Sequence, residues 1–109
     1  MDLQELLRET RAIERALRAP VVQASMLGQP EEVRERFVSA RQELSSLVAR
    51  LVNAQIEALA TKLDELAPDL KKGIAEIGAR MDQLDKPAPL LKALGGFLGL
   101  LARVAVLAK

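Results

Sequence analysis

The side chains that most often carry out catalysis or bind metals are missing from this sequence. It contains no histidine, cysteine, tyrosine or tryptophan, so the usual general bases, thiolate nucleophiles and soft metal ligands are absent. The remaining candidates are carboxylates, at Glu31, Glu32 and Glu35 and again at Asp82 and Asp85. A di-metal site in a helical bundle normally adds histidines to such carboxylates. We therefore interpret these acids as solvent-exposed, and predict neither a metal site nor enzymatic activity.

Two glycine-containing segments also fail to predict a cofactor. Residues 69–73 place a lysine pair before a glycine, and residues 95–99 contain three glycines around Phe97. A phosphate-binding loop follows a strand and opens a helix, and no strand is predicted before either segment. The net charge is only +1 and acids interleave the arginines, which argues against a nucleic-acid partner. We expect no cofactor and no nucleic acid.

The composition predicts an all-α fold within a single domain. Half of the 109 residues are hydrophobic, yet Phe37 and Phe97 are the only aromatic residues. A core made of leucine, alanine, valine and isoleucine, with many charged residues at helical spacing, is typical of coiled coils and long helices. We therefore expect a helical bundle or coiled coil built around one long heptad-patterned helix.

The N-terminal region predicts a helix over about residues 2–19 and two further helical turns before Gly28. Pro20 disfavours helical geometry at Ala19 and ends the first helix. One face of that helix is formed by residues that step by three and four: Leu3, Leu6, Thr10, Ile13 and Leu17.

The central region predicts one long helix over residues 31–67. Pro30 and the following acids are typical of a helix start, and neither glycine nor proline occurs within this range. Its length is about 37 residues, or roughly 55 Å at 1.5 Å per residue. Val48, Val52 and Ile56 follow one another at gaps of four, which shifts the heptad as a stutter does. At Pro68 we expect a kink or a very short turn into a helix over residues 69–85.

The apolar stripe of this long helix predicts self-association. The first helix, at roughly 27 Å, covers only about half of it. Long uncovered apolar surfaces are rare on soluble monomers, so we expect a homodimer or larger assembly rather than a monomer folded into an uneven bundle. The residues expected at the oligomer or partner interface are Val33, Phe37, Leu44, Leu47, Leu51, Ile56, Leu59, Leu63, Leu66, Leu70, Ile74 and Ile77.

The C-terminal segment, residues 87–109, differs chemically from the preceding region, residues 1–86. Pro87 and Pro89 predict a stiff linker, and a helix follows to about residue 108. Residues 86–109 contain four basic residues and no acid. In this helix Lys92, Gly96, Gly99 and Arg103 fall on one line of an otherwise apolar surface. The residues expected to pack or to contact lipid are Lys92, Gly95, Phe97, Gly99 and Arg103.

Three interpretations of this segment remain. We favour a helix buried in an oligomer, where Gly95, Gly99 and Ala102 let a neighbouring backbone approach closely. The second is a cationic helix lying on an anionic membrane surface. A transmembrane span ranks last, because the longest uncharged run, residues 93–102, is too short.

Together these features predict a non-enzymatic interaction or scaffold protein. It would act through homo-oligomerisation and through an apolar groove for a helical partner. The alternative is a peripheral membrane protein that uses the C-terminal helix. The N-terminus carries early acids and no apolar signal region, so we expect a cytoplasmic location, with membrane association under the alternative.

Overall fold

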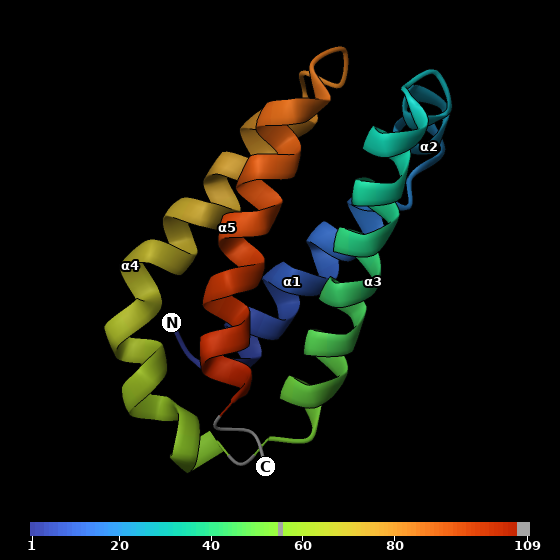
Figure 1. The fold of residues 1–109 in the computed structure, drawn as a ribbon. Helices are drawn as coiled ribbons and strands as arrows, with labels where there is room; N and C mark the ends of the chain where they lie inside the picture. The colour runs from blue at the N-terminus through green and yellow to red at the C-terminus, as the bar shows by residue number, and fades with distance from the viewer. Residues whose placement is uncertain (55, 107–109) are drawn as a thin grey trace.

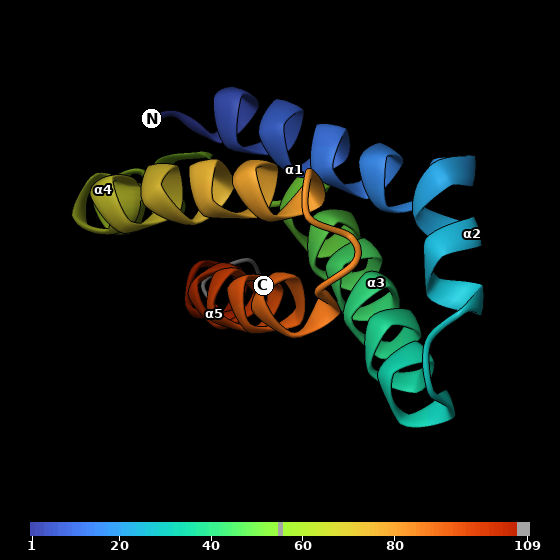
Figure 2. The ribbon, with the colours of Figure 1, turned by 90° about the horizontal axis from the view of Figure 1, so that it is seen from above.

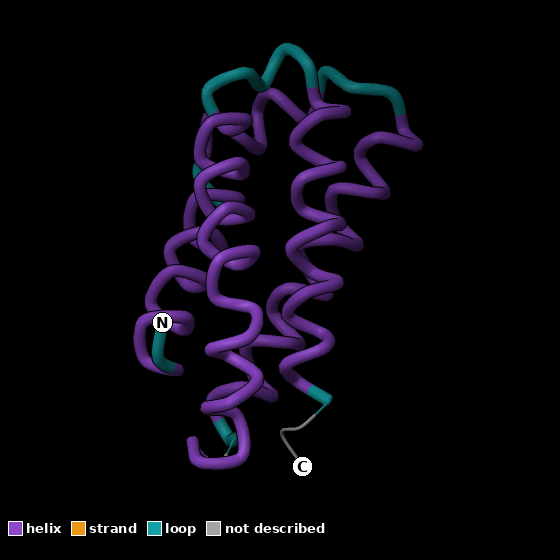
Figure 3. The backbone as a smooth tube through the Cα atoms, turned by 90° about the vertical axis from the view of Figure 1, so that its left-hand side faces the viewer, coloured by secondary structure: helices purple, strands orange, loops and turns teal. Residues whose placement is uncertain are grey.

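The chain folds into five packed α-helices in the computed structural model, which describes residues 1–54 and 56–106 and, for residues 56–58, the backbone alone (Figure 1). The helices are α1 (Leu3–Leu17), α2 (Pro20–Leu27), α3 (Glu31–Val52), α4 (Ile56–Met81) and α5 (Pro87–Ala105). The described part contains no strand (Figure 3). The predicted all-α fold is therefore confirmed.

Four of these helices form an elongated bundle, and the whole molecule measures 44 × 23 × 20 Å. Helices α1 and α5 each pack against both α3 and α4, and they lie on opposite sides of α4 when the bundle is viewed from above (Figure 2). The end that holds α2 and the α4–α5 connection is called the upper end here, as in Figure 1. Helices α1 and α4 run toward it, whereas α3 and α5 run away from it (Figure 1). Helices α3 and α5 are therefore parallel neighbours.

Helix α1 follows the sequence prediction closely. The Asp2 side chain caps it by accepting a hydrogen bond from the Glu5 amide at 2.7 Å, which satisfies a free N–H at the helix start. All five residues of the predicted apolar face are buried. Thr10 is the polar member of this face, and its hydroxyl donates to the Leu6 carbonyl at 2.9 Å, so its burial leaves no hydroxyl donor unpaired.

The predicted single helix over residues 31–67 is wrong. Helix α3 ends at Val52 and α4 begins at Ile56, where the heptad shift was noted. The Asn53 side-chain amide donates to the Ala49 carbonyl at 3.1 Å, which satisfies one of the free carbonyls at the end of α3. The physical reason is the burial of the apolar stripe. Because the chain reverses direction between α3 and α4, both halves of the stripe face one shared core. A straight helix would leave much of the stripe in water.

Pro68 does not start a new helix. Helix α4 continues through it from Ile56 to Met81, so the chain does not reverse there. The predicted boundary between residues 67 and 69 is therefore wrong, and the alternative of a helix that continues past Pro68 is confirmed. Pro68 is exposed, so its ring faces solvent, and water can satisfy the carbonyl one turn earlier that loses its usual donor.

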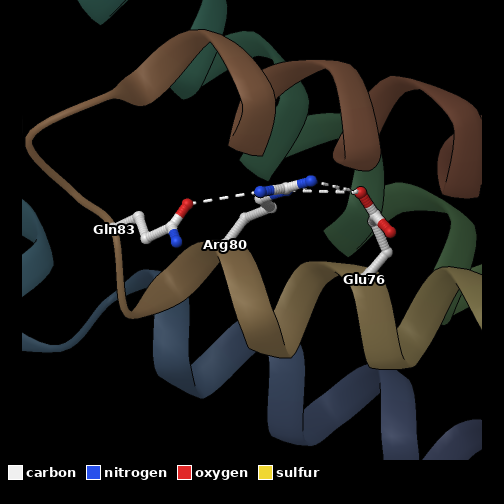
Figure 4. A network of polar contacts seen from close by, with 3 residues as sticks. All are labelled: Glu76, Arg80 and Gln83. Carbon is white, nitrogen blue, oxygen red and sulfur yellow. Dashed lines mark hydrogen bonds and ion pairs between the residues drawn. The ribbon is translucent and has the colours of Figure 1, made fainter.

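The α4–α5 connection is held by polar contacts at the end of α4. The Arg80 guanidinium lies between the Glu76 carboxylate and the Gln83 side-chain amide, at 3.2 Å from an oxygen of each (Figure 4). The Ser25 hydroxyl of α2 donates to the Leu84 carbonyl at 3.3 Å. These contacts attach the α4–α5 connection to α2 and to the end of α4.

Pro87 and Pro89 lie inside the first turn of α5. The stiff extended linker that the sequence predicts there is therefore wrong. Helix α5 begins at Pro87, and the first turn tolerates proline because its amides have no helical acceptor. The buried face of α5 consists of Leu90, Leu94, Phe97, Leu98, Leu101, Val104 and Ala105.

Candidate functional site

Most of the predicted interface stripe lies in the core of a single chain. The buried members are Phe37, Leu44, Leu47, Leu51, Leu59, Leu63, Leu66, Leu70 and Ile77. Val33 and Ile74 are partly buried, and the side chain of Ile56 lies outside the described residues. One chain thus covers most of the surface that we expected a partner to cover, so a binding surface must be sought elsewhere.

The C-terminal residues divide between the two faces of α5. Phe97 is 1% exposed and packs against α4 at Gly73, where an added β-carbon would lie 3.2 Å from the ring. Lys92, Gly99 and Arg103 are exposed on the opposite face, as is Gly95. Within one chain, the glycine that meets a neighbouring helix is Gly73 of α4. The close approach that we expected at the α5 glycines concerns a second copy and stays a prediction.

The outward glycines of α5 leave open space. A β-carbon added at Gly95, Gly96 or Gly99 would meet no atom of the described chain within 4 Å. Together with Lys92 and Arg103 they form the outer face of α5. This face is therefore narrow, flat and positively charged.

A groove of about 800 Å³ separates the first halves of α3 and α5 at the upper end of the bundle. We call it the α3–α5 groove. Its apolar lining comes from the half-buried Val33, Ala40 and Leu91 and from the buried Leu98. The exposed α5 residue Gly95 borders it without a side chain. The groove therefore offers an apolar floor that the chain itself leaves partly open.

The two walls of the α3–α5 groove carry opposite charge. The α3 wall contains Glu32, Glu35, Glu43 and Arg36, and Arg36 is paired with Glu32 at 2.8 Å. The α5 wall contains two lysines, Lys86 and Lys92, and no acid. The net charge is therefore minus two on the α3 wall and plus two on the α5 wall.

Four of these wall charges have no ion-pair partner within the described residues. The ion pairs in that part of the chain are Arg36–Glu32, Lys62–Glu65 and Arg80–Glu76. Glu35 and Glu43 on one wall, and Lys86 and Lys92 on the other, do not take part in them. Charges that face solvent beside an apolar floor favour a docked partner of complementary charge.

The acids considered for metal binding do not gather into a site. Glu31, Glu32, Glu35, Asp82 and Asp85 are all exposed. Among the described residues no group of three or more histidine, cysteine, aspartate or glutamate side chains could hold a metal ion.

A second apolar surface lies around α2. Val21 and Leu27 are 67% and 73% exposed, and Val38 of α3 is 38% exposed. A pocket of about 190 Å³ lies beside Leu27 and Val38. It is much smaller than the α3–α5 groove, which leaves the groove as the stronger candidate.

The comparisons with known proteins add no relative. No family model matches the chain, and no curated protein or solved structure matches it. Among the described helices, α5 is the one that is long and apolar enough to cross a membrane by length and composition. Its apolar side chains are largely those that form the bundle core.

Sequence reasoning missed the α3–α5 groove. It identified Val33, Lys92 and Gly95 but assigned no part in a binding surface to Glu32, Glu35, Glu43 or Lys86. The signal was the contrast between the glutamates that open α3 and the acid-free segment after residue 86. These residues come together in one groove only because α3 and α5 are parallel neighbours. That arrangement depends on the turn at Asn53, which the sequence did not predict.

Proposed function

We propose that this protein is a non-enzymatic interaction module that docks an amphipathic helix in the α3–α5 groove. The observation that carries the proposal is the open apolar floor between walls of opposite charge. Helices that dock in grooves place their apolar face on such a floor, and flanking charges set their orientation.

The lining of the groove defines the chemistry of its occupant. Glu32 and Glu43 are eleven residues apart on α3, which corresponds to roughly 16 Å, or about three helical turns. The occupant is therefore a helix of at least three turns with small or apolar residues on one face. Its edge toward α3 is basic, because that wall carries the unpaired Glu35 and Glu43.

Peptide binding to a single-cysteine variant tests this proposal. The chain has no cysteine, so a polarity-sensitive dye on Ser39→Cys is the single label, and it lies on the α3 wall of the groove. Two designed leucine–alanine peptides serve as probes, one with a lysine edge and one with a glutamate edge. At nanomolar protein, we expect the lysine-edged peptide to shift the dye emission, and to bind at least about tenfold more tightly than the other.

A charge-reversed groove supplies the control for the peptide experiment. In Glu35→Lys/Glu43→Lys the preference should move toward the glutamate-edged peptide, because both free acids of the α3 wall become basic. Lys71→Glu/Lys72→Glu, which changes exposed residues of α4, should leave the preference unchanged. Equal binding of both peptides, or no dye response to either, would contradict the proposal.

Binding to an anionic membrane surface is a second candidate function. The outer face of α5 carries Lys92 and Arg103 without any acid, and among the described helices α5 is the one long and apolar enough to cross a membrane by length and composition. Vesicles of phosphatidylserine and phosphatidylcholine should co-sediment with the full chain, whereas Lys92→Glu/Arg103→Glu should remain in solution. If the parent chain also remains in solution, or if the variant still sediments, this candidate is wrong.

A further inference from the structure

We infer that the occupant of the α3–α5 groove is the α5 helix of a second copy, which makes the protein a two-fold symmetric homodimer. This inference rests on the proposed function, because it names the partner of the same groove. In this dimer the outer face of each α5 lies in the groove of the other copy. The contact therefore occurs twice.

The outer face of α5 is narrow and carries charge opposite to that of the α3 wall. The α5 wall, which is also basic, adds no such attraction. The outer face places Lys92, Gly96, Gly99 and Arg103 on one line, with no acid among the exposed residues. The glycines have open space above them, so a second helix can approach the backbone closely. The two basic residues flank the glycines and reach toward the neighbouring wall of the other copy.

The opposing charges also begin at the same end of the bundle. From the upper end downward, the acids of α3 are Glu32, Glu35 and Glu43. The basic residues of the α5 segment follow in the same direction as Lys86, Lys92 and Arg103. Because α3 and α5 both run away from the upper end, each group of three begins in the first turn of its helix or directly before it.

The opposite charges of α3 and α5 favour one symmetry. A two-fold axis parallel to the helices brings α3 of one copy against α5 of the other, without reversing either. Each acid-bearing wall then faces a basic α5. A two-fold axis that crosses the helices would instead bring α3 against α3, with glutamates facing glutamates. Like charges across an interface cost several kcal/mol, so the parallel arrangement is the one that the charges favour.

A charge-swap experiment tests the dimer and its symmetry together. Glu35→Lys/Glu43→Lys makes both contacts of a dimer basic against basic, and Lys92→Glu/Arg103→Glu makes both acidic against acidic. We expect the parent to sediment with twice the mass of the 11.9 kDa chain at tens of micromolar. Each variant alone should dissociate at least about 100-fold more readily.

An equimolar mixture of the two variants should restore the dimer, because both contacts are then again between opposite charges. The rescue also shows that each variant is folded, since an unfolded chain would not regain the parent mass. Lys71→Glu/Lys72→Glu changes the same net charge on an exposed part of α4, and its mass should equal that of the parent.

Three outcomes would overturn the inference, and they separate it from the proposed function. A parent that stays monomeric while the lysine-edged peptide still shifts the Ser39→Cys dye means that the groove binds another protein. A dimer that survives in both variants uses a different surface. A monomeric parent with no peptide response removes the inference and the proposed function together.

Discussion

At the scale of single residues, the contact between α4 and α5 at Phe97 depends on Gly73. An added β-carbon there would lie 3.2 Å from the Phe97 ring, which is 1% exposed. A ring enclosed by its neighbours moves only at a cost, and overfilling a packed core typically costs about 1–3 kcal/mol. The glycine thus sets how near α4 and α5 approach, and with it the position of the outer face of α5.

Gly73→Ala is predicted to be less stable than Gly78→Ala, although both glycines lie in α4. Alanine gains up to about 1 kcal/mol in helix propensity at either position. An added β-carbon at Gly78 has nothing within 4 Å in the described chain, so the gain is kept there. The free energies of unfolding, measured in urea, should differ by about 1–3 kcal/mol. Equal values would show that Phe97 adjusts freely.

Single-residue burial was the most predictable aspect of the structure. The face of α1 follows directly from residues spaced by three and four, including the polar Thr10, whose hydroxyl finds a carbonyl in its own helix. The outward direction of the α5 glycines was not predictable in this way. Glycine has no side chain whose burial could be inferred, and its surroundings depend on which helices become neighbours.

At the scale of elements, α4 contains a proline in its interior, and the packing of the neighbouring residues makes this proline tolerable. Helix α4 spans 26 residues, and Pro68 occupies an exposed position within it. The buried Leu66 and Leu70 lie on either side in the sequence. Packing of the flanking leucines therefore holds the helix together across a residue that cannot donate a backbone hydrogen bond.

Pro68→Ala is predicted to raise the free energy of unfolding by about 1–3 kcal/mol. The alanine restores an amide donor in the helix interior and removes the clash of the ring with the preceding turn. Urea unfolding followed by circular dichroism measures the change. Pro30→Ala is the matched control, since Pro30 directly precedes α3, and its stability should change by less than about 1 kcal/mol. A destabilised Pro68→Ala would show that the proline shapes α4 to fit the core.

The helix boundaries at Pro20 and Gly28 were predictable from local chemistry, whereas the α3–α4 boundary and the continuation of α4 through Pro68 were not. Pro20 and Gly28 limit α2 as expected. The turn after Val52 contains neither residue, and its sequence is compatible with a continuous helix. The break arises because a reversed chain buries both halves of one stripe, which is a property of the whole bundle and not of the turn.

At the scale of the whole molecule, the fold turns an apparent surplus of apolar surface into a closed core. The sequence predicted correctly that a long stripe needs covering, but it did not reveal that the chain covers the stripe by folding on itself. Neighbour relations between helices, such as α3 beside α5, follow from two reversals whose positions must both be known. The candidate groove depends on that relation, so its residues could not be grouped from their spacing alone.

The alternating directions of the four long helices determine where a tag or a fused domain would lie relative to the α3–α5 groove. An even number of passes brings the end of α5 back toward the part of the bundle where α1 begins, away from the α4–α5 connection (Figure 1). A tag, a neighbouring domain or a solid support joined at either terminus would therefore lie away from the α3–α5 groove. In a pair of copies related by an axis along the helices, all four termini would point the same way. Two cargoes fused to such a pair would be held side by side.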